Sequence, residues 1–233
     1  MPTLSYLERR GELETYFDRT AADAWKRLTS DVPVSGIRKT VRAGRDQMRN
    51  TLLSWLPDDL TGARILDAGC GTGALAYELA QRGADVVATD LSSTLISLAR
   101  DRSPATPGRG RVEFRVGDFL YRDLGRFDHV VAMDSLIHYR APDMVGALAQ
   151  MAARTETSVV FTFAPRTPLL ATMHAVGRLF PRGDRAPAIE PISRSGLGAR
   201  IERDAALTQW REGREHRVTT GFYMSHALEL VRA

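Results

Sequence analysis

The sequence contains very little cysteine, very little lysine and no long apolar run. Cys70 is the single cysteine among 233 residues, which excludes an internal disulfide. No apolar run approaches the roughly 18 residues of a membrane span. Glu8, Arg9 and Arg10 interrupt the N-terminus where a signal peptide would be apolar. We therefore expect a cytoplasmic protein.

The positive charge is carried almost entirely by arginine. The formal net charge is +4, and among the 32 basic residues only Lys26 and Lys39 are lysine. Codon usage in a GC-rich genome would explain this bias, and so would a need for bidentate contacts with carboxylates. A nucleic-acid-binding protein would show a dense basic stripe interleaved with aromatic residues. The sequence has no such stripe, so we expect no nucleic acid as a partner.

A short apolar run is followed by an acid and three alternating glycines. Residues 64–67 predict a buried parallel strand that ends at Asp67; Gly69, Gly71 and Gly73 follow, and residues 74–80 predict a helix. Glycine lets the backbone turn sharply and approach a ligand, and the first N–H groups of a helix point toward it. The segment therefore predicts a nucleotide-like ligand at the carboxyl edge of a sheet.

Two ligand classes fit this loop. Gly69, Gly71 and Ala74 match the glycine pattern of dinucleotide-binding proteins. However, the carboxylate of Asp67 would repel a pyrophosphate, whereas it suits a ligand with an ammonium group. The loop resembles the first motif of class I S-adenosylmethionine-dependent methyltransferases.

Further acids extend that resemblance over about fifty residues. Asp90 ends a second predicted strand, residues 85–89, about twenty residues after the loop, where a ribose-binding carboxylate is expected. Asp118 and Phe119 follow a third predicted strand, residues 112–116. They resemble the methyltransferase segment in which the acid meets the adenine amino group and the next residue packs on the ring. A dinucleotide site does not predict this last feature.

The remaining pattern predicts one sheet with a helical extension before it. Further strands are expected at residues 127–133, 158–163, 210–219 and 223–231, and helices at residues 142–151, 169–180 and about 200–208. Ahead of the first strand, helices are expected near residues 4–17, 20–28 and 35–56. We predict a Rossmann-like class I methyltransferase fold of the α/β class, with a seven-stranded, mostly parallel sheet whose last strand is antiparallel.

The same pattern gives a domain division. Residues 1–58 are expected to form the N-terminal helical extension, partly as a lid over the strand ends. Residues 59–233 are expected to form the S-adenosylmethionine-binding domain, with a substrate-binding insertion at about residues 165–200.

Four stretches outside the shared core resemble one family. They are residues 16–18 together with Trp25, residues 133–139 (Met-Asp-Ser-Leu-Ile-His-Tyr), the loop 180–189 and the tail 221–225 (Gly-Phe-Tyr-Met-Ser). Together they resemble the magnesium-protoporphyrin IX O-methyltransferases over nearly the whole chain. The resemblance implies methyl transfer from S-adenosylmethionine to the ring C propionate of magnesium-protoporphyrin IX in bacteriochlorophyll synthesis, with S-adenosylhomocysteine as the second product.

The resemblance also implies the partners and the site residues. Magnesium is carried by the substrate, with no metal bound by the protein itself. The large porphyrin-binding subunit of magnesium chelatase is an implied partner, and contact with the photosynthetic membrane is at most peripheral. His138 and Tyr16 map onto the catalytic positions. The cofactor-binding residues are expected to be Asp67, Gly69, Gly71, Gly73, Asp90, Leu91, Asp118, Phe119 and Met133. The substrate-binding residues are expected to be Trp25, Tyr139, His174, Arg182 and Arg185.

The implied acceptor makes a general base unnecessary. A propionate is already ionised near neutral pH. We therefore expect His138 and Tyr16 to orient and desolvate the carboxylate by donating hydrogen bonds, without removing a proton. Axial ligation of the substrate magnesium by His138 is the competing account.

Several alternatives stay open. A methyltransferase acting on another small molecule, such as a quinone phenol, would use His138 as a base. A dinucleotide-binding protein and a non-catalytic pigment-binding protein are alternatives from other classes. Tyr16 as a core aromatic and His138 as a structural histidine are the corresponding structural interpretations.

Overall fold

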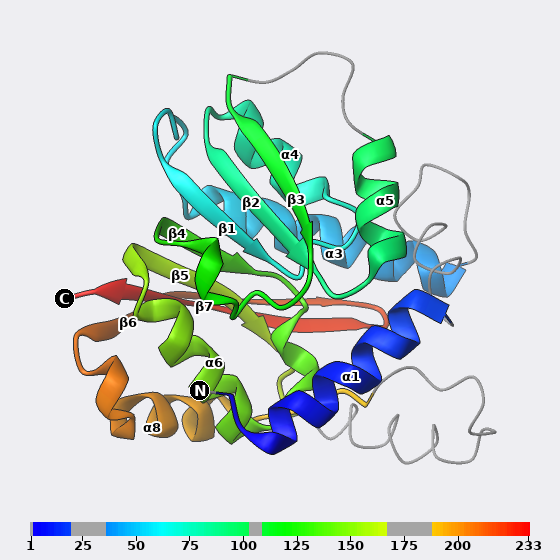
Figure 1. Cartoon of the computed structure of the whole chain (residues 1–233). Helices are drawn as coiled ribbons and strands as arrows, with labels where there is room; N and C mark the ends of the chain where they lie inside the picture. Colours follow the sequence, from blue (N-terminus) through cyan, green and yellow to red (C-terminus); the bar gives the residue numbers. More distant parts are fainter. Residues whose placement is uncertain (1, 20–35, 103–108, 167–187) are drawn as a thin grey trace.

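The computed structural model describes residues 2–19, 36–102, 109–166 and 188–233 (Figure 1). These residues fold around a seven-stranded sheet in the order β3-β2-β1-β4-β5-β7-β6. The strands are β1 (Arg64–Ala68), β2 (Asp85–Asp90), β3 (Arg111–Val116), β4 (Phe127–Ala132), β5 (Thr155–Phe163), β6 (Trp210–Thr220) and β7 (Tyr223–Arg232). Paired strands are parallel except that β7 runs antiparallel to β5 and β6. The predicted fold class is confirmed.

The helices between the parallel strands cover the two faces of the sheet. They are α4 (Ala74–Gln81), α5 (Ser93–Asp101) and α6 (Ala141–Ala152). Successive strand residues point to opposite faces; accordingly, Leu66 and Val130 lie in one core cluster, and Ile65 and Val131 lie in the other. Each of these four side chains is fully buried, which explains why adjacent apolar residues occur in the middle of both strands.

The helix near the C-terminus begins earlier than the sequence predicts. Helix α8 spans Arg194–Arg203, followed by a short 3-10 turn at Ala205–Leu207, in place of one helix over about 200–208. The reason is capping: the Ser193 side chain accepts a hydrogen bond from the Gly196 N–H at 3.1 Å and starts the helix there. Asp204 in the same way accepts from the Ala206 N–H and starts the turn.

The first helix, α1 (Leu4–Arg19), lies across the carboxyl edge of the sheet. At one end, Ser5 donates to Asp143 near the start of α6 at 2.8 Å. At the other end, Asp18 accepts from the Thr94 N–H at the start of α5 at 3.1 Å. Helices that follow parallel strands begin at the carboxyl edge, so α1 is tied to that edge at both ends. Tyr6 and Leu13 of α1 are buried in the same core cluster as Leu66.

Helix α3 (Gly36–Ser54) packs against β6 and β7. Its buried residues Met48, Leu52 and Leu53 join the core cluster that contains Ile65. Close approach to β7 depends on Gly44, where an added Cβ would lie 2.5 Å from the Tyr223 ring. The helices expected near residues 20–28 and 169–180 lie outside the described residues. No helix in the described ranges is long and apolar enough to cross a membrane.

Candidate functional site

A cavity of about 350 Å³ lies at the carboxyl edge of the sheet, where α1 and α3 meet the strand ends. It brings together nine of the residues that the sequence assigns to a site: Asp67, Gly69, Gly71, Asp90, Leu91, Phe119, Met133, His138 and Tyr139. Gly73, Asp118 and Tyr16 are not among the lining residues. Trp25, His174, Arg182 and Arg185 lie outside the described residues. The roles predicted for all of these residues remain predictions.

The glycines of the loop after β1 serve different purposes. Gly69 has φ 82°, and an added Cβ would lie 2.4 Å from the Ser135 Cβ, so this glycine allows the loop to touch the segment after β4. The Gly71 N–H donates to Asp90 Oδ2 at 2.9 Å, which joins the loop to the end of β2. Gly73 has φ 80°, and an added Cβ would lie 2.9 Å from the Phe114 ring. Gly73 therefore lets the start of α4 lie against β3, while Ala74 and Leu75 of α4 line the cavity.

Asp67 is the most perturbed acid of the cavity. It is 1% exposed, and its Oδ2 atom has no hydrogen-bond partner among the described residues. Burial, and next to it the charge of Asp90, raises the pKa of Asp67 to about 7. A buried carboxylate oxygen without a partner is costly unless a ligand supplies a donor or a positive charge. The site thus fits a ligand that carries an ammonium group.

Asp90 closes the other side of the loop. Its carboxylate accepts from the Gly71 N–H at 2.9 Å and from the Ser92 N–H at 3.0 Å. Burial raises the pKa of Asp90, although these backbone donors act in the opposite direction. A carboxylate offers about four lone-pair positions, so Asp90 can accept further hydrogen bonds from ligand hydroxyls.

Asp118 is turned toward α1 by its hydrogen bonds. It is 2% exposed and accepts from the Tyr6 hydroxyl at 2.9 Å, from the Leu120 N–H at 2.9 Å and from Arg10 at 3.3 Å. Tyr6 stacks on Tyr139 with 4.6 Å between the ring centroids. The segment after β3 that the sequence assigns to adenine is therefore also one of the segments to which α1 is attached.

His138 ends a 3-10 turn, Leu136–His138, just after β4. It is 9% exposed, and burial lowers its pKa to about 4, so the imidazole is neutral near pH 7. Its Nδ1 atom lies 3.4 Å from the Ala188 carbonyl oxygen. A carbonyl can only accept, so Nδ1 carries the proton, and Nε2 is left as an acceptor. In this tautomer Nε2 can coordinate a cation, whereas donation to a carboxylate through Nε2 requires the other tautomer or a protonated ring.

Tyr16 does not line the cavity, whereas its neighbour Phe17 does. The Phe17 ring meets the His138 ring edge-on, with 5.9 Å between centroids. Tyr16 is half-buried beside Phe17, and burial raises its pKa. The helical spacing of Leu13 and Phe17, four residues apart on one face of α1, is the signal in the sequence that could have identified both as lining residues.

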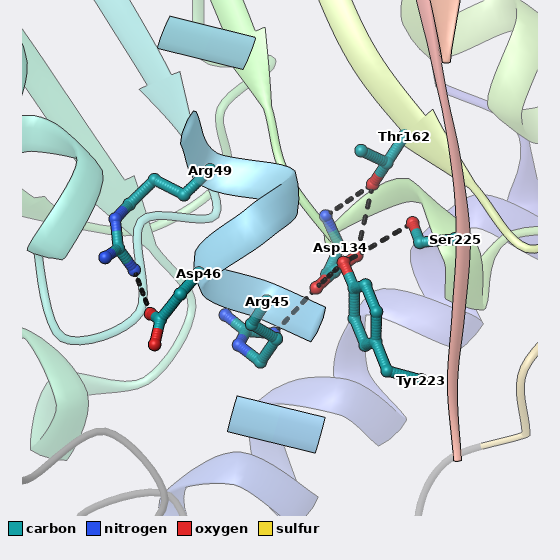
Figure 2. Close-up of polar contacts among 7 residues, drawn as sticks. All are labelled: Arg45, Asp46, Arg49, Asp134, Thr162, Tyr223 and Ser225. Atoms are coloured by element: carbon teal, nitrogen blue, oxygen red, sulfur yellow. Dashed lines mark hydrogen bonds and ion pairs between the residues drawn. The ribbon is translucent and has the colours of Figure 1, made fainter. Parts of the chain in front are cut away.

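Helix α3 supplies polar lining residues that the sequence analysis missed. They are Arg42, Arg45, Asp46 and Arg49. Their spacing of three to four residues places them along one helix face. Arg45 pairs with Asp134 at 2.8 Å, and Arg49 pairs with Asp46 at 2.8 Å (Figure 2). Among the described residues, no three His, Cys, Asp or Glu side chains are grouped so that they could hold a metal ion.

Comparisons with known proteins point to one family over almost the full length of the chain. Residues 132–232 match the family described as "Magnesium-protoporphyrin IX methyltransferase C-terminus", and residues 65–157 match the family described as "Methyltransferase domain". The chain is 51% identical over 230 residues to the magnesium-protoporphyrin O-methyltransferase of Rhodobacter capsulatus, which covers 98% of this chain and 99% of that protein.

A solved structure shares the whole fold. The crystal structure of magnesium protoporphyrin IX methyltransferase from Synechocystis PCC 6803 with bound S-adenosylhomocysteine has a TM-score of 0.83 at 27% identity, covering 96% of this chain and 100% of that chain. By contrast, a ubiquinone biosynthesis O-methyltransferase of Xanthomonas oryzae is 33% identical over only 133 residues, or 54% of this chain and 55% of that protein. The similarity to the quinone enzyme thus covers about half of the chain.

Proposed function

The chain belongs to the magnesium-protoporphyrin IX methyltransferase family, and we propose that it methylates the ring C propionate of magnesium-protoporphyrin IX, forming the monomethyl ester on the route to bacteriochlorophyll. It is an S-adenosylmethionine-dependent O-methyltransferase with the class I fold. The observation that carries the proposal is that the buried carboxylate of Asp67 and the half-buried carboxylate of Asp90 line the same cavity as Phe17 and His138.

The described residues fit the cofactor. Asp67 offers a buried, unpartnered oxygen to the ammonium group, and Asp90 offers its remaining acceptor positions to the ribose hydroxyls. Phe119 and Met133, both buried at the cavity wall, offer apolar surface to the adenine. When bound, S-adenosylmethionine supplies a methyl group made electrophilic by its positively charged sulfur.

The acceptor needs no base, because a propionate is already ionised. A carboxylate oxygen forms the new bond to carbon while the carbon–sulfur bond breaks and its electron pair returns to sulfur, so no proton is transferred. What this chain must do is remove water from one carboxylate oxygen and hold it in line with the methyl group. Leu13 and Phe17 of α1 supply apolar surface at the cavity for this purpose.

His138 is assigned a different role from the one expected from the sequence. We propose that its Nε2 lone pair ligates the magnesium of the bound porphyrin. The Nδ1–H group donates to the Ala188 carbonyl, which leaves the lone pair of the neutral ring on Nε2. Axial ligation would also fix the height of the ring in the cavity. The competing assignment as a base for a phenol is energetically poor: a phenol has a pKa near 10, and His138 has a pKa of about 4, so the proton transfer would be uphill by about 8 kcal/mol.

A methyl-transfer assay with labelled S-adenosylmethionine tests the proposal. We expect base-labile label on magnesium-protoporphyrin IX, much less on metal-free protoporphyrin, and none on a quinone phenol. Label on the phenol alone would support the quinone alternative. Tight binding of the magnesium porphyrin without any transfer would support the pigment-binding alternative.

The axial-ligand role has its own readout. His138→Ala should weaken binding of the magnesium porphyrin and change its visible absorption spectrum when bound, yet leave binding of the metal-free porphyrin within about twofold. His129→Ala is the matched control, because His129 is a buried histidine on β4 that does not line the cavity. Equal losses for both porphyrins in His138→Ala would contradict the assignment.

The resemblance further supports two proposals about the surroundings of the protein. The first is a cytoplasmic location with peripheral contact at the photosynthetic membrane. The second is direct transfer of the porphyrin from the large subunit of magnesium chelatase. Co-sedimentation with vesicles, and with that purified subunit loaded with porphyrin, tests them separately.

A further inference from the structure

Two stretches of the chain that lie far apart in sequence meet at one carboxylate. Asp134 follows β4, and Tyr223 and Ser225 belong to β7 at the other end of the chain. Both stretches belong to the phrases by which the chain resembles its family, yet the methyl-transfer chemistry described above uses neither Tyr223 nor Ser225. Figure 2 shows them around Asp134, together with Thr162 of β5 and Arg45 of α3.

Asp134 is held rigidly by these neighbours. Its side chain is 7% exposed. It accepts from the Tyr223 hydroxyl at 3.0 Å and from the Ser225 and Thr162 hydroxyls at 3.3 Å, and its own N–H donates to Thr162 Oγ1 at 2.7 Å. Its backbone has φ 53°, the left-handed region that non-glycine residues rarely adopt. So many contacts on one strained residue indicate that its position matters to the cavity beside it.

What Asp134 positions is Arg45. Arg45 Nη1 lies 2.8 Å from Asp134 Oδ2, and both residues line the cavity. Gly44 allows α3 to pack directly on the Tyr223 ring, which brings the next residue, Arg45, to this wall. Tyr223 therefore contributes twice, through its ring to the position of α3 and through its hydroxyl to the position of Asp134.

An arginine held by one carboxylate can bind a second one. The guanidinium group has five N–H donors on different edges. Arg49, one turn further along the same helix, shows this arrangement, with Nε on Glu78 at 2.6 Å and Nη1 on Asp46 at 2.8 Å. Arg42 lines the cavity three residues before Arg45, on the same helix face.

We propose that Arg45, held in place by Asp134, forms a carboxylate-binding subsite for a ligand of this cavity. The inference rests on the proposed function, which supplies two ligands with carboxylates: the amino-acid end of the cofactor, and the propionates of the porphyrin. The subsite adjoins the glycine loop, because Gly69 packs on Ser135, the neighbour of Asp134. Under the proposed function, the amino-acid end of the cofactor lies beside this loop, next to Asp67, and the reacting propionate approaches the methyl group from the same side of the cavity.

The test compares each ligand with a counterpart that lacks the carboxylate. The cofactor arm measures binding of S-adenosylhomocysteine and of 5′-methylthioadenosine. The porphyrin arm measures binding of magnesium-protoporphyrin IX and of its dimethyl ester. Arg45→Gln should weaken at least one carboxylate ligand by about tenfold or more, the scale of a hydrogen bond to a charged group, while its counterpart changes by less than about twofold. The arm that responds identifies the source of the carboxylate.

Matched variants separate this subsite from general damage. Arg45→Lys should retain part of the selective affinity, because it keeps the charge. Arg38→Gln removes the same charge from the exposed start of α3, outside the cavity lining, and should change no ligand. Asp134→Asn and Tyr223→Phe should weaken the same ligand as Arg45→Gln does, by smaller factors, because they act through the position of Arg45.

Two results would overturn the inference. One is unchanged binding of all four ligands to an Arg45→Gln protein that is folded by circular dichroism. The other is an equal loss for each ligand and its carboxylate-free counterpart, which would make Arg45 a purely structural residue. The cofactor arm needs no porphyrin activity, so a selective loss of S-adenosylhomocysteine binding would support the subsite even if the proposed substrate were wrong.

Discussion

Cofactor binding should release a proton from Asp67. In the ligand-free protein, burial and the charge of Asp90 raise the pKa of Asp67 to about 7. If the ammonium group of the cofactor sits against Oδ2, the ionised carboxylate becomes favoured, and the pKa falls below the working range. Binding then releases the proton from the fraction of Asp67 side chains that were protonated before the cofactor bound.

The size of the effect follows from that pKa. With a pKa of about 7, roughly nine-tenths of the Asp67 side chains are protonated at pH 6, about half at pH 7 and about one-tenth at pH 8. The number of protons released should follow these fractions. By linkage, affinity should rise about tenfold per pH unit well below pH 7 and level off above it. The sign is set by the raised pKa: the protonated form, abundant at low pH, opposes binding.

Calorimetry of S-adenosylhomocysteine binding in buffers of different ionisation enthalpy measures the release directly. At pH 6 the amino group of the ligand is fully protonated, so its own titration does not interfere. Asp67→Asn should release no proton from this position and lose most of the pH dependence. Asp85→Asn is the matched control, because Asp85 begins β2 at the end of that strand away from Asp90 and the cavity. No release by the wild type at pH 6, or the same release by Asp67→Asn, would refute the reasoning.

Three further predictions concern other parts of the site. Burial lowers the pKa of His138 to about 4, so a pH–rate profile of kcat/KM for the porphyrin, measured at saturating cofactor to exclude the titration of Asp67, should show no inflection near 6.5. The contribution of His138 to stability should be complete above pH 6.5 and be lost as the pH falls toward 4, which urea unfolding at several pH values measures. Tyr6→Phe removes the 2.9 Å hydrogen-bond donor to buried Asp118 and should lower the free energy of unfolding by about 1–3 kcal/mol. As the control, Tyr121→Phe changes a side chain that is 47% exposed and should change the free energy of unfolding by less than about 0.5 kcal/mol. Equal urea midpoints for the two variants would count against the attachment of α1 to the segment after β3. Gly69→Ala places a Cβ 2.4 Å from the Ser135 Cβ at a backbone φ of 82°, so it should reduce cofactor affinity by at least about tenfold. Gly146→Ala is the control in the same binding assay, because nothing lies within 4 Å of the added atom.

The sheet and the residues at its strand ends could be predicted from the sequence. Asp67 and Asp90 each end an apolar run, and parallel strands bring their carboxyl ends to one edge, so their proximity follows from local pattern alone. The comparisons with known proteins confirm the family, the fold class and the cofactor class that the sequence predicts. The start of α8 was missed because Ser193 was not recognised as its capping residue.

Contacts between α1, α3 and the sheet could not be predicted in the same way. That Asp118 accepts a hydrogen bond from Tyr6 depends on where α1 docks. The two residues are 112 positions apart, and the sequence carries no periodic signal for this pairing. Arg45 was missed for a similar reason. Its place in the cavity depends on the packing of Gly44 against Tyr223, two residues that only tertiary structure brings together.

This difference suggests how the protein divides its work. The strand ends, which local sequence determines, provide groups suited to the adenosyl ligand that class I methyltransferases share. Helices α1 and α3 form the other walls and lie outside the sheet. Hydrogen bonds of Asp143 and Asp18 hold α1 in place, and packing on Tyr223 of β7 holds α3. The match to the quinone enzyme covers only about half of the chain, whereas the match to the porphyrin family covers nearly all of it. Substrate identity should therefore depend on these outer walls, and changing Phe17 should alter the choice of acceptor while leaving in place Asp67 and Asp90, the two acids proposed to bind the cofactor.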